Sequence, residues 1–171
     1  TRLDENRGKA QIAKKLGVTA GAVKNLAIWG NHSNTMFPDF YNATSGQSSV
    51  VEQVGETWGQ GDFMQTVSTR GKAIIMARGA SSAASAASAA VDHMRSWWLG
   101  TPAGEHTSMA LWSSGEYGVP EGLIFSFPVT VKGGVATVVD GIEHNDYAKG
   151  KIEATAAELL SEREAVAELL S

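Results

Sequence analysis

The chain has 171 residues, of which 43% are hydrophobic and 19% charged, as is ordinary for one globular domain. Its formal net charge is −4 and it has no block of lysine or arginine, which excludes the basic surface that nucleic-acid binding needs. It contains no cysteine, which excludes disulfides, thiol catalysis and zinc-thiolate sites, and no run approaches the ~18 apolar residues of a membrane span. We therefore expect neither nucleic acid nor a membrane as partner, and the lack of cysteine fits the reducing environment of a cytoplasmic protein.

The first predicted element is a helix over residues 4–16. Asp4 is a suitable N-cap, two lysines suit the last turn, and Gly17 suits the position just past the end. Asp4 and Arg7 are three positions apart, so their side chains share one face near the helix start. Spacing alone favours a solvated capping aspartate beside a surface arginine, although the same pair is able to converge on one pocket.

A strand over residues 26–29 comes next and leads to a single histidine. Gly30 and Asn31 are turn residues, so His32 lies at the mouth of the strand, where sheet proteins usually gather their sites. A lone histidine in a loop is more often a hydrogen-bonded structural residue than a catalyst, and both interpretations stay open at this point. The aromatic, proline-containing segment 36–40 is predicted to pack as a loop over the site.

The most helical part of the chain is residues 61–100. Apolar residues keep helical spacing there, Gly71 interrupts them, and Gly79 marks a break, so we expect two helices or one bent helix. The Ser/Ala-rich run 81–90 contains no glycine and is interpreted as a close-packed helix, not as a flexible linker. Ser82 and Ser85 are placed to offer hydroxyls to a pocket, although simple helix packing is the commoner role for such residues.

Strand character is predicted in five further segments, at residues 41–44, 49–54, 107–112, 123–130 and 135–139. The first two are expected to form a hairpin around Gly46. The last three are expected to form an antiparallel sheet, in which Pro128 indicates an edge strand or a bulge.

The last predicted element is an amphipathic helix over residues 145–170. Its glutamates are expected to face water, and its buried stripe is expected to consist of Ile152, Ala156, Leu159, Val166 and Leu170. Helices and antiparallel strands are mixed along the chain without regular βαβ repeats. The predicted fold class is therefore α+β, with long helices packed on antiparallel strands.

Several motifs, in this order, resemble the cytosolic-type branch of the malate dehydrogenase family, which includes many bacterial enzymes. They begin at Thr1 (TRLDENR), Ile28 (IWGNHS), Arg78 (RGASSAAS), Gly115 (GEYGVPEG) and Phe125 (FSFP). The resemblance runs over nearly the whole chain but covers only the C-terminal, substrate-binding half of that family's fold. It implies that residues 1–171 are the catalytic domain of a malate dehydrogenase whose N-terminal NAD-binding domain is missing.

The resemblance also implies catalytic roles. His32 would be the acid/base in the reversible NAD-dependent oxidation of L-malate to oxaloacetate, Asp4 would orient its ring, and Arg7 would bind a substrate carboxylate. These residue types suit these roles because histidine is the side chain that exchanges protons near neutral pH, and guanidinium forms two-pronged bonds to carboxylates.

Weaker assignments follow from the same resemblance. Gly71 and Ser82 would line the substrate pocket, and Asn31 with His32 would touch the cofactor. The main NAD site would lie in the missing half, because the nearest thing to a glycine-rich nucleotide turn is Gly59-Gln60-Gly61, with Met64 in place of the third glycine. No metal is implied.

Two alternatives stay open. Lactate dehydrogenase activity arises in this family through a mobile loop that the chain lacks, and a noncatalytic domain that binds a dicarboxylate or a partner protein would keep the same fold. The choice between NAD and NADP would also be set in the missing half. Homodimerisation is implied as well, with residues 4–16 and 61–100 as contact surfaces. The start at Thr1 fits either processing or an origin in a longer polypeptide.

Overall fold

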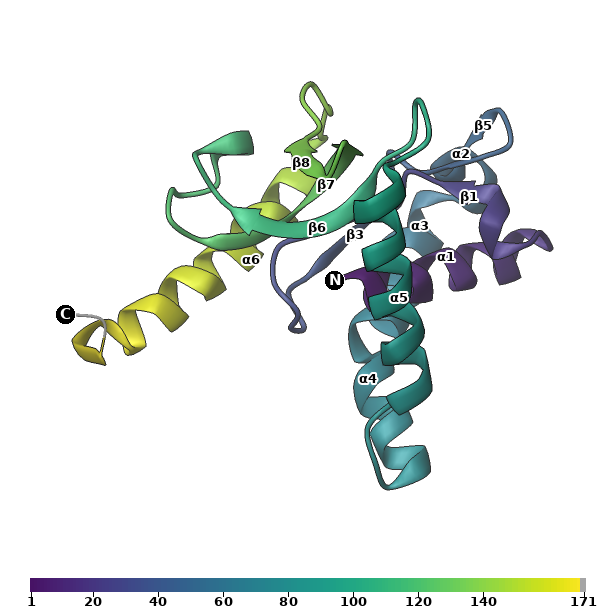
Figure 1. The fold of residues 1–171 in the computed structure, drawn as a ribbon. Coiled ribbons are helices and arrows are strands. Elements are labelled where there is room, and N and C mark those ends of the chain that lie inside the picture. Colours follow the sequence, from purple (N-terminus) through teal and green to yellow (C-terminus); the bar gives the residue numbers. More distant parts are fainter. Residues whose placement is uncertain (170–171) are drawn as a thin grey trace.

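A computed structural model describes residues 1–169 (Figure 1). The helices are α1 (Arg2–Leu16), α2 (Val50–Val54), α3 (Glu56–Trp58), α4 (Met64–Arg78), α5 (Ala83–Leu99) and α6 (Asp146–Ala165), with a π-helical turn at Gly59–Phe63 and 3-10 turns at Ala20–Ala22, Glu116–Gly118 and Ala167–Leu169. The strands are β1 (Val23–Lys24), β2 (Ala27–Trp29), β3 (Phe37–Asp39), β4 (Thr44–Ser45), β5 (Ser48–Ser49), β6 (Thr107–Trp112), β7 (Ile124–Lys132) and β8 (Val135–Val138). No helix in this part of the chain is long and apolar enough to cross a membrane.

The strands form three small sheets, ordered β1-β4-β5, β2-β3 and β6-β7-β8. Gly30, directly after β2, exchanges two backbone hydrogen bonds of 3.0 and 2.8 Å with Ser126 of β7, and this bridge joins the second sheet to the third. Every strand pair among residues 1–169 is antiparallel. The mixture of helices and antiparallel strands confirms the predicted α+β class.

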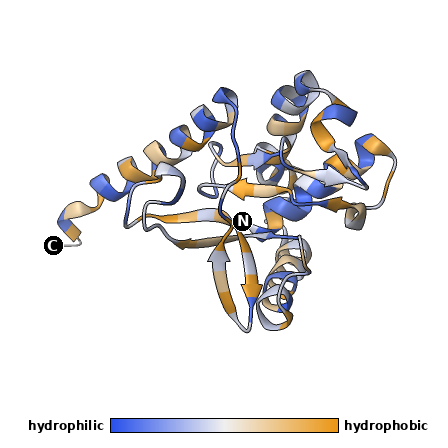
Figure 2. Ribbon diagram, turned by 90° about the horizontal axis from the view of Figure 1, so that it is seen from above, coloured by the Kyte–Doolittle hydropathy of each residue, from blue (hydrophilic) through white to orange (hydrophobic). Residues whose placement is uncertain are grey.

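Two clusters of buried apolar side chains fill the interior. The first lies between the sheets and α6, and its largest members include Trp29, Phe37, Phe125, Phe127 and Ile152. The second lies beneath α1, and its largest members include Ile12, Leu26, Phe40, Phe63 and Val67. Figure 2 shows hydrophobic residues along the strands and an alternation of hydrophilic and hydrophobic residues along the helix that leads to the C-terminus.

Glu5 attaches α1 to the third sheet. Its carboxylate is fully buried and accepts hydrogen bonds from the backbone N–H of Ser108 (2.7 Å) and from the hydroxyl of Thr107 (2.9 Å) at the start of β6. It also pairs with Lys9 at 2.6 Å and Arg2 at 3.9 Å. Burial acts to raise the pKa of Glu5, but the two cations and the hydrogen bonds outweigh it and hold that pKa below its ordinary value.

The predicted helix 4–16 is confirmed as α1, and Gly17 ends it in the left-handed conformation with φ of 69°. The capping role expected of Asp4 is wrong. The helix begins at Arg2, directly after Thr1, and Asp4 lies in its first turn with a fully buried side chain. Asp4 therefore lies inside the helix, and its side chain is turned towards other parts of the fold instead of capping the helix end.

Two local predictions between residues 36 and 54 are wrong. Residues 37–39 form β3, which pairs with β2 and is buried, where a loop was expected. A hairpin around Gly46 is confirmed, but only as the two-residue strands β4 and β5, and Val50–Val54 forms α2 instead of continuing a strand. Both segments are too short for side-chain periodicity to separate strand from helix or loop.

The two helices expected within residues 61–100 are confirmed as α4 and α5, separated at Gly79. Gly71 lies inside α4 without interrupting it. Close packing of the Ser/Ala run is wrong, because Ala89 is the one buried residue of α5. In Figure 1 both helices extend away from the sheets. They leave apolar side chains exposed, among them Ile75, Met76, Val91, Met94, Trp98 and Leu99.

The last predicted helix is confirmed as α6, which begins after Asn145, whose side chain accepts the N–H of Ala148 at 2.9 Å. Ile152 and Ala156 are buried as expected and Leu159 is partly buried, but Val166 is 41% exposed and Leu170 lies outside the described residues. Thr155 is fully buried and was not part of the expected stripe.

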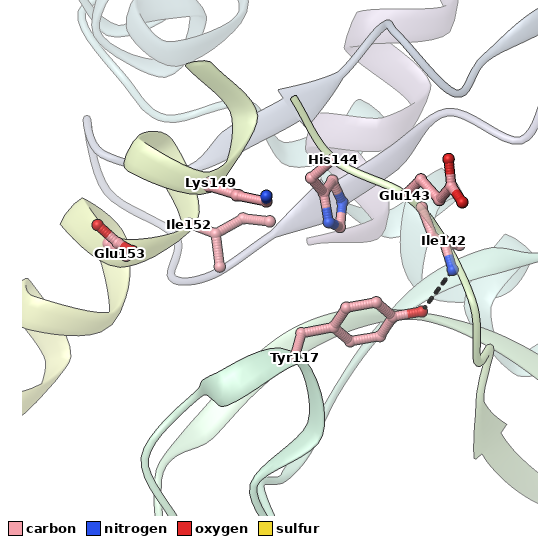
Figure 3. A pocket seen from close by; sticks show the side chains of 7 residues that line it. All are labelled: Tyr117, Ile142, Glu143, His144, Lys149, Ile152 and Glu153. Carbon is pink, nitrogen blue, oxygen red and sulfur yellow. Dashed lines mark hydrogen bonds between the residues drawn. The ribbon is translucent and has the colours of Figure 1, made fainter. Parts of the chain in front are cut away.

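Pro128 occupies an interior strand, not the edge or bulge expected for it. The strand β7 is central in its sheet, and Pro128 pairs in regular register with Ser108. On the other side Val139 donates its N–H to the carbonyl of Pro128, but proline cannot return the bond. The hydroxyl of Tyr117 donates to the Val139 carbonyl instead, at 2.5 Å, and accepts the N–H of Ile142 at 3.1 Å (Figure 3).

We predict that Tyr117→Phe lowers the free energy of unfolding by about 1–3 kcal/mol, because it leaves the Val139 carbonyl without a donor. Tyr147→Phe is the matched control, since the Tyr147 hydroxyl makes no hydrogen bond to a described residue and its ring is partly buried as well. Urea denaturation followed by circular dichroism measures both. Equal losses in the two variants would contradict the role assigned to the Tyr117 hydroxyl.

We predict that Glu5→Gln lowers the free energy of unfolding at pH 7 by about 2–4 kcal/mol, because the charges of Lys9 and Arg2 lose their buried partner. The folded state holds the pKa of Glu5 below its ordinary value, so this stabilisation is complete above about pH 4.3 and is lost as the pH falls through the lower folded-state pKa. Denaturation curves between pH 2 and 7 should therefore converge in acid. The control is Glu52→Gln, because Glu52 is exposed. A difference in unfolding free energy between Glu5→Gln and the wild type that stays constant with pH would contradict the assignment.

Candidate active site

His32 and Asp4 meet although they belong to different elements. The buried strand β2 and the backbone bridge at Gly30 place His32 next to the first turn of α1. There its Nδ1 lies 2.6 Å from Oδ2 of Asp4. The Asp4 carboxylate is fully buried, whereas the side chain of His32 is 63% exposed. A carboxylate accepts only, so the ring N–H at Nδ1 donates to it, and Nε2 is left as the nitrogen that can exchange a proton with a ligand.

Arg7 binds the other oxygen of the same carboxylate. Its Nη1 lies 3.3 Å from Oδ1 of Asp4 and its Nη2 lies 3.5 Å from the hydroxyl of Ser82, which precedes α5. Its side chain is 11% exposed, and its Nε is buried without a hydrogen-bond partner among the described residues. Gly71 of α4 faces the guanidinium closely, because a Cβ there would lie 3.7 Å from Nη1.

Five of the six predicted site residues are thus brought together, from α1, the end of β2, α4 and the start of α5. The sixth, Asn31, is next to His32 in the chain but its polar groups are already engaged. Its backbone N–H donates to Thr155 at 3.1 Å, and its side chain donates to Thr35 at 2.8 Å and accepts the N–H of Ser33 at 3.0 Å.

Sequence reasoning missed the contribution of α6 to this site. The glutamates of α6 were expected to face water, yet Glu158 accepts hydrogen bonds from the hydroxyls of Ser33 and Thr35. These bonds, from Thr35 first and then Ser33, hold the pKa of Glu158 below its ordinary value. A glutamate on the face that the amphipathic pattern assigns to water carries no local signal of such a contact.

Not every surface groove of the structure includes the predicted site residues. A groove of about 590 Å³, drawn in Figure 3, is lined by Tyr117, His144, Lys149 and their neighbours and contains none of the predicted site residues. A smaller crevice of about 350 Å³ lies beside Arg7, between α1, α4 and α5. Among residues 1–169 no group of three or more His, Asp or Glu side chains is placed to hold a metal ion.

The fold of this chain belongs to a known family. Residues 1–170 match the model of the lactate/malate dehydrogenase, alpha/beta C-terminal domain, so the chain belongs to the lactate/malate dehydrogenase family. A curated malate dehydrogenase from Cutibacterium acnes is 52% identical over 169 residues, which are 99% of this chain and 52% of that protein. This relative is an oxidoreductase of the kind that the sequence motifs resemble.

Two solved structures show the same fold over the whole chain. A malate dehydrogenase from Naegleria fowleri is 42% identical with a TM-score of 0.90, over 99% of this chain and 52% of that one. A Trichomonas vaginalis lactate dehydrogenase in complex with NADH and oxamate is 34% identical with a TM-score of 0.94, over 99% of this chain and 54% of that one. The chain spans about half the length of these relatives.

We predict that Gly71→Ala raises the free energy of unfolding by about 0.5–1 kcal/mol, because glycine inside a helix is unfavourable relative to alanine. The new Cβ would meet the Arg7 guanidinium at an ordinary contact distance of 3.7 Å, so nothing has to move. Gly150→Ala in α6 is the control, with open space around its Cβ. Thermal denaturation measures both, and a loss of stability at position 71 alone would mean that Arg7 needs more room than this geometry allows.

Proposed function

We propose that this chain is the C-terminal catalytic domain of a malate dehydrogenase, which catalyses the reversible NAD-dependent oxidation of L-malate to oxaloacetate. The observation that carries the proposal is the buried Asp4 carboxylate, which binds the His32 ring with one oxygen and the Arg7 guanidinium with the other. That arrangement places a proton acceptor beside a carboxylate receptor, and the reaction of a 2-hydroxy acid needs both.

In the proposed mechanism Nε2 of His32 takes the proton of the substrate hydroxyl during oxidation and returns it during reduction. The ring can do so without losing its orientation, because Nδ1 stays bonded to the buried Asp4 carboxylate, which also stabilises the imidazolium that forms. Arg7 would bind a substrate carboxylate and so hold the hydroxyl near Nε2. Gly71 would leave space beside the guanidinium, and Ser82 would fix one of its nitrogens.

NAD would supply the hydride acceptor, but the described residues do not form its main site. They contain no glycine-rich turn between a strand and a helix, and the Asn31 side chain proposed to touch the cofactor is engaged by its neighbours. We therefore propose that most of the NAD site lies in a further, nucleotide-binding domain, and that the chain by itself does not turn over. No metal has a role in this mechanism.

Malate is the proposed substrate because the 52% and 42% identical relatives are malate dehydrogenases. The Trichomonas vaginalis structure keeps lactate as the alternative. Homodimerisation is part of the same proposal, and the exposed apolar side chains of α4 and α5 are the surface that we assign to it. The cytoplasm is the proposed location, and it rests on the family resemblance.

The test joins this chain to the part of the Cutibacterium acnes malate dehydrogenase that lies outside the matched region, in one polypeptide. We expect the fusion to oxidise NADH faster with oxaloacetate than with pyruvate, and the chain alone to oxidise it with neither. Preference for pyruvate would favour the lactate alternative. A folded fusion that binds NADH and reduces neither substrate would contradict the proposed function.

We predict that His32→Asn in this fusion lowers kcat by about 10²- to 10⁴-fold, because the asparagine amide cannot exchange a proton. NADH affinity, measured by fluorescence titration, should stay within about twofold, because most of the proposed NAD site lies in the nucleotide-binding domain and not around His32. His93→Asn, the same substitution on α5 away from the site, is the control. Loss of NADH binding together with turnover would indicate a structural role for His32.

A further inference from the structure

The loop that carries His32 is held from the side opposite Asp4 by α6. Thr155 of α6 is fully buried, and its hydroxyl accepts the N–H of Asn31 at 3.1 Å. The helix comes so close to the chain here that a Cβ on Gly30 would lie 2.2 Å from the Thr155 side chain, and Gly30 also has φ of +95°. The backbone just before His32 therefore lies in direct contact with α6, and only glycine suits position 30.

Glu158 lies one turn further along α6 and faces the same loop. Its two carboxylate oxygens accept the hydroxyl of Ser33 at 2.7 Å and the hydroxyl of Thr35. Asn31 closes the arrangement, because its side chain donates to the Thr35 oxygen and accepts the N–H of Ser33. The residues immediately before and after His32 are thus joined to each other and to one carboxylate.

The direction of these hydrogen bonds depends on Glu158. Asn31 donates to Thr35, so the Thr35 hydroxyl has its own proton free to donate onward, and it donates to Glu158. Ser33 donates to the same carboxylate from the other side. A carboxylate has no proton and only accepts, so each of its two oxygens takes one hydroxyl proton, whereas a neutral amide has a single acceptor oxygen.

We propose that Glu158 is a positioning residue for His32. It holds the 31–35 loop at the place where Nδ1 of His32 reaches the buried Asp4, and it does so without touching the ring. The catalytic part of this assignment rests on the proposed function, whereas the structural part concerns only the His32–Asp4 contact. A glutamate that merely fastened α6 to the body would affect stability and leave that contact unchanged.

The variants that test this are Glu158→Ala and Glu158→Gln, with Glu162→Ala as the matched control. Glu162 is exposed and lies one turn beyond Glu158 on the same helix. Glutamine keeps the shape of the side chain and one acceptor oxygen, so Glu158→Gln should behave between the wild type and Glu158→Ala. Asp4→Asn marks the signal that belongs to the His32–Asp4 hydrogen bond.

The first readout is the proton NMR signal of the His32 Nδ1–H in the 171-residue chain, which the hydrogen bond to Asp4 protects from exchange with water. We expect Glu158→Ala to speed that exchange by ~10-fold and Glu162→Ala to leave it unchanged. Unchanged exchange in a folded Glu158→Ala variant overturns the proposal. Where that variant does not fold, the double variant Ser33→Ala, Thr35→Val removes the two donors and is read in the same way.

The second readout is steady-state kinetics of the fusion described above. Displacement of the acid/base should lower kcat by ~10- to 100-fold in Glu158→Ala while the KM for oxaloacetate changes less than ~3-fold, because Arg7 lies outside the loop. Equal changes in kcat for Glu158→Ala and Glu162→Ala overturn the catalytic part. A wild-type fusion without turnover is a failure of the proposed function alone, and the exchange readout then still decides whether Glu158 positions His32.

Discussion

Two neighbouring carboxylates in the first turn of α1, Asp4 and Glu5, are the constraint on which the rest of the structure depends. Both are fully buried, and burial of a charge is costly unless charged or hydrogen-bonding partners compensate it. Glu5 accepts hydrogen bonds from β6, whereas Asp4 contacts His32 and Arg7. Since consecutive residues of a helix point about 100° apart, fixing Glu5 against the sheet also fixes the direction in which Asp4 points. One helix turn therefore connects the fold to the site.

The sequence predicts the long elements of this fold well and the short ones poorly. Helices α1, α4, α5 and α6 and the third sheet carry enough residues for periodicity and end signals to agree. The strand β3 was missed because an aromatic segment with Pro38 is typical of a loop, yet β3 pairs on one side only, where proline is tolerated. The prediction for Pro128 was wrong because a distant residue compensates for the proline. Pro128 has no N–H to donate to the Val139 carbonyl, and the hydroxyl of Tyr117 donates to it instead.

Sequence reasoning also identified some residues of the candidate site and missed others. Asp4, Arg7 and His32 were found through their motifs, and the structure brings them together with Gly71 and Ser82. Spacing alone could not have done so, because it favoured a solvated Asp4, and the role of His32 stayed open without the motifs. Thr155 and Glu158 were missed because more than 120 residues separate them from the loop that they hold. Only the packing of α6 across the end of β2 reveals that contribution.

The exposed apolar side chains of α4 and α5 have a practical consequence for handling this chain. Trp98 is 85% and Met76 77% exposed, and the net charge of −4 provides little electrostatic repulsion between molecules. At high concentration these faces will drive reversible clustering, so the colloidal behaviour of a sample will depend on concentration and ionic strength before any unfolding occurs. Replacing Trp98 and Met76 by lysine or glutamate is the direct route to a dispersed sample, and it would also remove part of the surface that we assign to homodimerisation.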